Sequence, residues 1–332
     1  MDLDAYSAAH RDEWEALARL AGQRRFTGAD ADELIEAYQA GATQLSAIKT
    51  SAGQSVQGDR LSLLLSRARL RFTGADANVL SRLPAFFGTH LPAALYRIRW
   101  LSLAITVLSL IVGLLYAVWA IQNPGVLASV FGSDAERRQY VEHEFVQYYS
   151  TYSEGSFAGS VWTNNAWIAA QCVAFGIFGV YTPYLLFMNA MNIGYAGALM
   201  QQYGQLDTFF LYIAPHGQLE LYSIFVAGAA GLRIFWAWIA PGPRSRGQAL
   251  AQDARALFTV AIGLILALLV SGIIEGFVTR LDWPWPVKIG IGTLALAAFL
   301  AYQWLIGRWA ARAGHTGDLE DFAAGARRLV AG

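Results

Sequence analysis

The chain has 332 residues, of which 55% are hydrophobic and only 14% are charged, and its formal net charge is zero. Soluble globular proteins carry about 25% charged residues, so this composition argues against a soluble protein with one large buried core. The lack of excess positive charge argues against a nucleic-acid-binding protein, and we expect no nucleic-acid partner. The composition favours an all-α, polytopic membrane protein.

Residues 1–95 are predicted to form a cytoplasmic helical domain, because apolar residues recur there at helical spacing. These residues are Trp14, Leu17, Leu20, Leu34, Ile35, Tyr38, Leu45, Ile48, Leu61, Leu64, Leu65 and Ala68. The sequence Arg-Phe-Thr-Gly-Ala-Asp-Ala occurs twice, at 25–31 and at 71–77, each time before a helical pattern. Because Thr and Asp favour helix N-caps, we interpret this repeat as a helix-start signal rather than a binding motif.

Residues 96–310 are predicted to form a transmembrane helix bundle of about six membrane segments, because a span needs about 20 mostly apolar residues. The segments are expected at about 100–121, 164–187, 188–204, 219–240, 256–278 and 287–306. The glycine-interrupted segment 188–204 is expected to be short or re-entrant. The brief apolar piece 208–214 is expected to stop at Pro215.

Residues 122–163 form a polar excursion with an amphipathic, aromatic-rich pattern. The aromatic residues are Phe131, Tyr140, Phe145, Tyr148, Tyr149, Tyr152, Phe157 and Trp162. Aromatic side chains favour the membrane interface, so we expect an amphipathic segment lying on the outer side of the membrane. Adjacent residues point in different directions on a helix, so we interpret Glu142-His143-Glu144 as a solvated face rather than a metal site.

Basic residues gather at three places next to the predicted spans. They are Arg97 and Arg99, then Arg244, Arg246 and Arg255, and finally Arg308 and Arg312. With six crossings all three groups lie on one side, and cytoplasmic loops carry the excess of basic residues. Both termini, including a tail over 311–332, are therefore predicted to be cytoplasmic. Arg233 then lies in the cytoplasmic half of a span, where we expect it to snorkel or to bond a backbone carbonyl.

An ionisable pair lies beside the apolar run that begins near residue 219. Glu220 follows His216 by four residues, so on a helix the two side chains share one face. Glu275 ends another apolar run, and the predicted topology brings it to the same level near the outer leaflet. Asn164 and Asn165 reach this level too. Ionisable groups at membrane depth are costly and usually face a partner or a water-filled cavity, so these residues predict a buried polar site.

Three hypotheses remain open for His216, Glu220 and Glu275. A structural network would let them bond one another and the nearby asparagines. A metal site would use them as three ligands for a divalent transition metal such as zinc, whose bound water could hydrolyse a lipid-linked or peptide substrate. A proton or ion relay would belong to a permease-like transporter with helices broken by Gly and Pro. Asn189 and Asn192 are expected to support close helix packing within the polar network.

Four motifs in this order resemble the stage II sporulation protein M family of integral membrane proteins. They are Thr163-Asn164-Asn165-Ala166-Trp167, the segment 189–194, Pro215-His216-Gly217-Gln218-Leu219-Glu220, and Ile274-Glu275-Gly276-Phe277-Val278-Thr279. The resemblance covers about 100–306, with a weaker match in the N-terminal helical region. The composition, rich in Ala, Arg and Gly, resembles that of actinobacterial members.

The resemblance implies a plasma-membrane protein that works at the bacterial cell envelope, in a complex with peptidoglycan-cleaving partners. The family also occurs in bacteria that make no spores, so it does not by itself predict sporulation. We therefore expect a non-catalytic component that scaffolds envelope proteins through its cytoplasmic helices and the 122–163 segment. Membrane lipid and a second copy of the chain are further expected partners. A metal-dependent hydrolase is the first alternative and a transporter the second.

Overall fold

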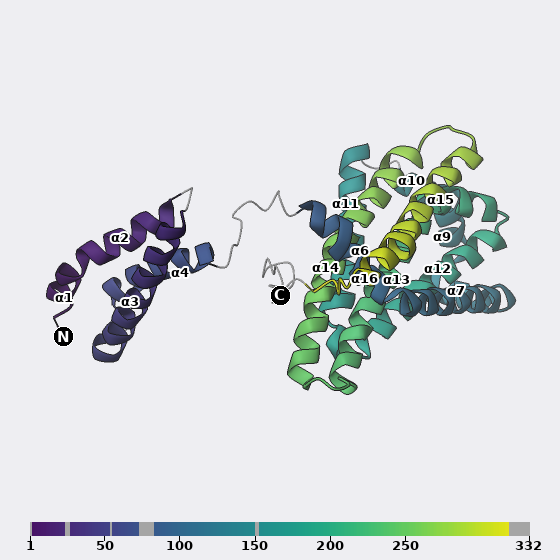
Figure 1. Ribbon diagram of the computed structural model, residues 1–332. Helices are drawn as coiled ribbons and strands as arrows, with labels where there is room; N and C mark the ends of the chain where they lie inside the picture. Colours follow the sequence, from purple (N-terminus) through teal and green to yellow (C-terminus); the bar gives the residue numbers. More distant parts are fainter. Residues whose placement is uncertain (1, 24–26, 54, 73–82, 150–152, 319–332) are drawn as a thin grey trace. The chain divides into compact units, whose positions relative to one another are not determined.

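The computed structural model describes residues 2–23, 27–53, 55–72, 83–149 and 153–318. Throughout these ranges the regular structure is helical, without a β-strand, which confirms the all-α prediction. The chain divides into two compact units, one within residues 1–81 and one within residues 82–320 (Figure 1).

The first unit is a small bundle of four helices. They are α1 (Leu3–Ala9), α2 (Arg11–Gly22), α3 (Gly28–Ala52) and α4 (Val56–Phe72). Helices α2, α3 and α4 pack against one another around a core that includes Trp14, Leu17, Leu34 and Leu61. The indole Nε1 of Trp14 donates to Gln44 Oε1 at 2.7 Å, so the polar atom of this core residue is satisfied. This unit therefore has a hydrophobic core of its own.

The first copy of the repeated motif is a helix N-cap. Thr27 Oγ1 accepts a hydrogen bond from the backbone N–H of Asp30, and Asp30 Oδ2 accepts one from the backbone N–H of Thr27 at 2.8 Å. This reciprocal capping box begins α3 and confirms the predicted helix-start role at Thr27 and Asp30, while residues 25 and 26 of this copy lie outside the described residues. Most of the second copy, from residue 73, lies outside the described residues.

The second unit contains the predicted membrane helices. Its α-helices are α6 (Leu91–Arg97), α7 (Arg99–Gln122), α8 (Pro124–Phe131), α9 (Asp134–Gln139), α10 (Phe145–Tyr148), α11 (Glu154–Ala174), α12 (Tyr181–Gln202), α13 (Leu206–Ile239), α14 (Arg246–Ile273), α15 (Trp285–Ala301) and α16 (Gly307–Arg312). Short π-helical segments occupy Phe86–His90, Tyr140–Glu144, Ile274–Val278 and Tyr302–Ile306, and a 3-10 turn occupies Gly176–Phe178.

Four helices in the described part of the chain are long and apolar enough to cross a membrane. They are Arg99–Gln122, Leu206–Ile239, Arg246–Val278 and Trp285–Arg312. Helices α11 and α12 have 21 and 22 residues but do not reach the same level of apolarity. Four candidate spans are thus established, and six crossings remain a prediction.

The chain turns near residue 178, where the sequence predicts a continuous span over 164–187. Helix α11 ends at Ala174, and α12 begins at Tyr181 and continues through the segment expected to be short. Two glycines explain the position of the turn. Gly179 has φ of 71°, which L side chains rarely adopt, and a Cβ at Gly176 would lie 2.4 Å from Gly231 Cα. The predicted boundaries of these two segments are wrong.

Pro215 does not end a helix. It lies inside α13, an unbroken helix of 34 residues, so the predicted stop is also wrong. Proline removes one backbone donor, but packed neighbouring helices allow proline within membrane helices. Here α15 packs directly onto the position: a Cβ on Gly292 would lie 2.0 Å from the carbonyl oxygen of Pro215. This close approach packs α15 against α13 at the residue that precedes His216.

Helix α13 lies at the centre of the second unit. It packs against α7, α11, α12, α14 and α15, and it is the most buried of the four candidate spans. Helix α14 follows it after a short loop and packs beside it along much of its length. The interface between α13 and α14 therefore positions the polar residues described below.

Candidate functional site

The structure brings the three predicted site residues together. His216 and Glu220 lie one turn apart on α13, and Glu275 lies in the π-helical segment that follows α14. Each residue offers a ligand atom, and these atoms all lie within 4.8 Å of one another. Within the described ranges, this is the one group of three His, Cys, Asp or Glu residues with such geometry.

The His216–Glu275 contact leaves polar atoms unsatisfied. Nε2 of His216 lies 3.7 Å from Oε1 of Glu275, which is too long for a hydrogen bond. The two residues are 4% and 3% exposed, and Oε2 of Glu275 has no hydrogen-bond partner among the described residues. A purely structural buried network is expected to satisfy its members, because an unpaired buried polar group is costly. This cluster is therefore incomplete as it stands.

Hydroxyl groups on α14 and just after it orient the cluster. Ser271 Oγ donates to the backbone carbonyl of His216 at 3.0 Å and lies 3.4 Å from Glu220 Oε2. Thr279 Oγ1 lies 3.4 Å from both His216 Nδ1 and the carbonyl oxygen of Ile274. When the Thr279 hydroxyl directs its proton to Ile274, it is able to accept a hydrogen bond from Nδ1–H of His216, and this arrangement selects the tautomer of His216 with the proton on Nδ1.

This tautomer of His216 directs a lone pair at Glu275. When Nδ1 carries the proton, Nε2 is an acceptor, and the carboxylate of Glu275 is an acceptor too. Two facing acceptors repel one another unless a cation or a proton lies between them. Metal-binding histidines commonly donate their second ring N–H to an oxygen in this way, which fixes the ring for coordination.

The donor set fits a divalent transition metal with small adjustments. One imidazole nitrogen and two carboxylate oxygens are ligands that zinc accepts, and catalytic zinc sites use three protein ligands with one open position. Donors about 2.1 Å from a tetrahedral ion lie about 3.4 Å apart. The three donor atoms lie within 4.8 Å of one another, so side-chain movements of about 1 Å would bring them to the spacing of a metal site.

One aromatic residue of the 122–163 segment, Tyr149, lies beside the cluster. The ring centroid of Tyr149 lies 6.1 Å from that of His216 and 5.0 Å from that of Tyr212. Burial raises the pKa of Tyr149 well above its usual value, and the nearby charges of Glu275 and Glu220 raise it further. Tyr149 is 4% exposed. The segment thus contributes a buried phenol beside the site.

The four predicted asparagines have different surroundings. Asn165 is buried on α11 and within hydrogen-bonding reach of Glu220, whereas Asn164 is exposed beside it. Asn189 and Asn192 lie on α12, and no hydrogen bond in the described part of the chain joins them to the cluster. Close helix packing, which the sequence predicted for this segment, occurs on α12 at Gly194, where a Cβ would lie 2.4 Å from the carbonyl oxygen of Gly113.

The other acidic cluster of the sequence is solvated, as predicted. Glu142, His143 and Glu144 are all exposed in the π-helical segment Tyr140–Glu144. Their side chains do not form a group with metal-ligand spacing among the described residues.

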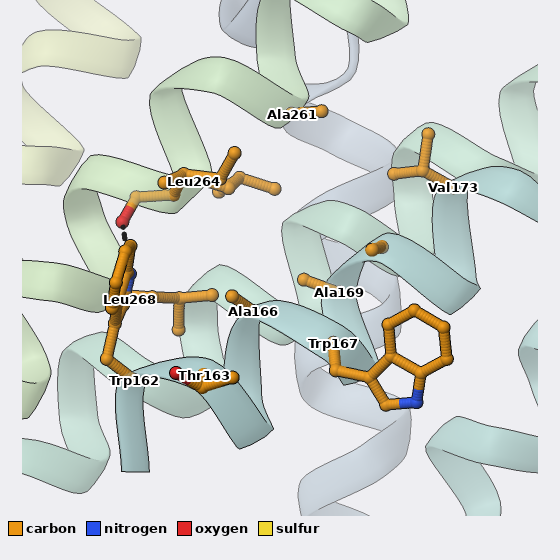
Figure 2. A pocket seen from close by; sticks show the side chains of 11 residues that line it. Trp162, Thr163, Ala166, Trp167, Ala169, Val173, Ala261, Leu264 and Leu268 are labelled. Carbon is orange, nitrogen blue, oxygen red and sulfur yellow. Dashed lines mark hydrogen bonds between the residues drawn. The ribbon is translucent and has the colours of Figure 1, made fainter. Parts of the chain in front are cut away.

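A groove of about 470 Å³ lies between α11 and α14 (Figure 2). Its lining is almost entirely apolar and includes Trp162, Ala166 and Leu268. Ala166 follows Asn165 directly, and Leu268 lies three residues before Ser271, so the groove begins about one helical turn from the cluster. Its shape and lining fit a hydrocarbon chain.

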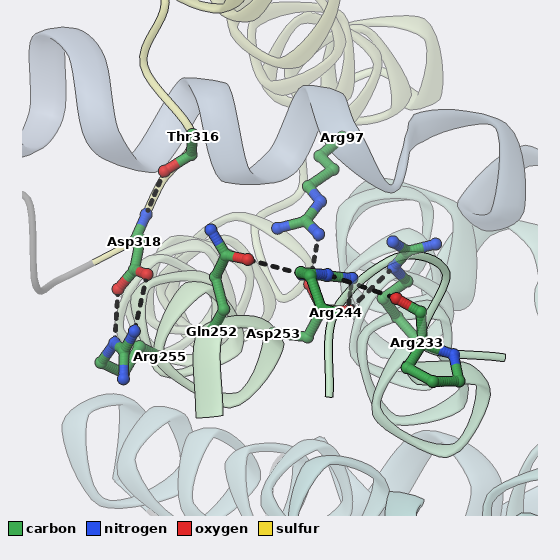
Figure 3. A network of polar contacts seen from close by, with 9 residues as sticks. Arg97, Arg233, Arg244, Gln252, Asp253, Arg255, Thr316 and Asp318 are labelled. Carbon is green, nitrogen blue, oxygen red and sulfur yellow. Dashed lines mark hydrogen bonds and ion pairs between the residues drawn. The ribbon is translucent and has the colours of Figure 1, made fainter. Parts of the chain in front are cut away.

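Three residues of the site were missed in the sequence: Ser271, Thr279 and Tyr149. A spacing signal was present, because Ser271, Glu275 and Thr279 are four residues apart and share one helical face. Tyr149 had no such signal, since it comes from a segment that is remote in sequence. Arg233 has a partner that the sequence did not reveal, because its Nε lies 3.5 Å from Oδ2 of Asp253 (Figure 3).

The fold and the cluster together define an all-helical membrane protein with a buried His/Glu/Glu site. Residues 102–280, more than half of the chain, match the family model of stage II sporulation protein M. The chain belongs to this family. Residues 4–74 match a second family, described as a domain of unknown function (DUF8413). Neither a curated protein nor a solved structure matches the chain.

Proposed function

We propose that this protein is a membrane-embedded, metal-dependent hydrolase of the bacterial cell envelope, with His216, Glu220 and Glu275 as the metal ligands. One observation carries the proposal: donor atoms of His216, Glu220 and Glu275 lie within 4.8 Å of one another, with His216 and Glu275 buried, and Glu275 Oε2 has no hydrogen-bond partner among the described residues. We place the protein in the bacterial plasma membrane with both termini in the cytoplasm, because the basic residues beside the spans gather on one side of the membrane in the proposed topology.

The proposed chemistry divides the roles among the side chains. His216, Glu220 and Glu275 would hold a divalent metal, which would supply an activated water as nucleophile at neutral pH. Oε2 of Glu275, which has no hydrogen-bond partner among the described residues, is the group that would accept a proton. Ser271 and Thr279 would hold Glu220 and His216 in position. The apolar groove between α11 and α14 supports a lipid-linked substrate, because its lining suits a hydrocarbon chain.

The hydrolase hypothesis is tested with the purified full chain and fluorescent lipid-linked substrates in mixed micelles. Wild-type protein should release product only with metal present, and Glu275→Gln should remain folded and lose at least 100-fold in rate. Asn192→Ala is the control, because Asn192 is exposed on α12 and no hydrogen bond in the described part of the chain joins it to the cluster, so this variant should keep its rate. Hydrolysis that persists in folded Glu275→Gln would rule out this site as the catalytic centre.

A scaffold role in an envelope complex is the second candidate. Its support is the N-terminal unit, which has a hydrophobic core of its own and matches a separate family. Partners would bind this unit or the aromatic-rich segment 122–163. Cross-linking in cells, followed by removal of residues 1–72, tests the idea. Unchanged cross-linked partners after the removal would contradict a scaffold role for this unit.

A transporter is less well supported than either candidate. That hypothesis depended on helices broken by Pro215 and by the glycines after residue 188. Helix α13 runs through Pro215 without a break, and α12 runs through Gly194 and Gly197.

A further inference from the structure

A second buried charge cluster lies at the end of the bundle where α13 gives way to α14. Asp253 on α14 is 1% exposed and faces three arginines (Figure 3). Arg97 hydrogen-bonds to its Oδ1, while Arg233 Nε lies 3.5 Å and Arg244 Nη2 3.8 Å from its Oδ2. Within the described ranges no other carboxylate pairs with these three arginines, so the cluster carries two surplus positive charges.

The surplus charge is accessible from outside the protein. The side chains of Arg97, Arg233 and Arg244 are 28%, 34% and 30% exposed, although their shared carboxylate is buried. Nε of Arg233 has no hydrogen-bond partner among the described residues. Burial lowers the pKa of Arg97, Asp253 raises it, and the charges of Arg233 and Arg244 lower it again. The three guanidinium groups therefore share one carboxylate, and the pKa of Arg97 is lowered, first by burial.

The cluster lies at the depth of lipid headgroups. Helix α13 has 34 residues, about 51 Å at 1.5 Å per residue, whereas the hydrocarbon core is about 30 Å thick. Arg233 is six residues from the C-terminal end of this helix. Trp236 and Trp238, which follow it, are 56% and 49% exposed, and exposed tryptophans mark the membrane interface.

We propose that Arg97, Arg233 and Arg244 bind the phosphate group of an anionic phospholipid. Arginine is suited to this role because its planar guanidinium bonds two oxygens of one phosphate. Basic pockets between membrane helices are known to recognise anionic headgroups. Asp253 pairs with all three arginines, and its negative charge offsets part of the repulsion between them. Free inorganic phosphate has the same chemistry, but only a lipid presents its phosphate at this depth.

The test is a binding titration of the purified full chain in detergent. The probes are short-chain phosphatidylglycerol, short-chain phosphatidylcholine as the neutral lipid, and inorganic phosphate alone. Phosphatidylglycerol should bind at least tenfold more tightly than phosphatidylcholine. Removing one arginine, as Arg233→Gln or Arg244→Gln, should weaken phosphatidylglycerol binding about fivefold. Arg244 lies in the loop before α14, so its variant is the test if Arg233→Gln does not fold.

Arg246→Gln is the matched control, because Arg246 is exposed two residues from Arg244 and its removal changes the net charge equally. It should weaken binding less than twofold. An equal loss of affinity in Arg246→Gln would show general surface attraction and overturn the proposal. The proposal would also be overturned if the protein showed no preference for phosphatidylglycerol and did not bind phosphate. Binding of inorganic phosphate that Arg244→Gln abolishes, without lipid preference, would uphold the anion site and identify free phosphate as its ligand.

Discussion

Glu275 faces His216 across the interface of α13 and α14, with Oε1 3.7 Å from Nε2 and Oε2 left without a hydrogen-bond partner. The pair is almost completely buried, so leaving this carboxylate oxygen unpaired is costly. Packing alone would not require either polar group, and burying both without a hydrogen bond between them costs free energy. A shared proton or a bound cation would complete the pair, and the proposed metal would be that cation.

Ser271 should act through Glu220 and His216 rather than as a ligand. Ser271→Ala removes its bond to the His216 carbonyl and its contact with Glu220, and loss of such supporting bonds costs about 10- to 100-fold in metal affinity. Folding stability should fall by only about 1 kcal/mol. Competition with a metal-binding dye measures the affinity. An unchanged metal affinity in Ser271→Ala would contradict the positioning role.

Gly292 should be intolerant of any side chain. Gly292→Ala would place a Cβ about 2.0 Å from the Pro215 carbonyl oxygen and force α15 away from α13, at a cost of about 1–3 kcal/mol. Gly290→Ala is the control, since nothing lies within 4 Å of the added Cβ and alanine favours helix. Thermal unfolding in detergent compares the two. Equal stability of both variants would refute the close packing at Pro215.

Tyr149 should make stability depend on pH above 10. Its pKa is raised in the fold, first by burial and then by Glu275 and Glu220, whereas the unfolded chain ionises near 10. The folded state thus holds its proton longer, and stability is lost as pH rises above the unfolded pKa. Tyr149→Phe should remove this part of the decline between pH 9 and 11. The unfolding temperature of both proteins over this range is the measurement, and parallel curves would contradict it.

The six-crossing topology places residues 122–163 outside the cell. Ser156→Cys introduces an exposed thiol on α11, and the native Cys172 is buried, which keeps background labelling low. An impermeant maleimide should label the new thiol on intact cells. Labelling that appears only after the cells are opened would put this segment in the cytoplasm.

The residues of the site could be predicted from the sequence more fully than the bounds of the helices on which they lie. His216 and Glu220 were found by their spacing on one helix, and Glu275 by its cost at membrane depth, since both signals are local. The turn near Gly179 and the continuity of α13 at Pro215 depend on contacts with Gly231 and Gly292, which are remote in sequence. Asp253 was missed for the same reason, because its three arginine partners come from three separate parts of the chain.

The most direct test of the metal site is the metal content of the purified protein, measured by elemental analysis after supplementation and removal of loosely bound ions. Glu275→Gln is the matched variant, because it keeps the size and polarity of the side chain and removes its charge. The account predicts about one transition-metal ion per wild-type chain and less than a tenth of that in a folded Glu275→Gln. No stoichiometric metal in the wild-type protein, or equal content in both proteins, would contradict it.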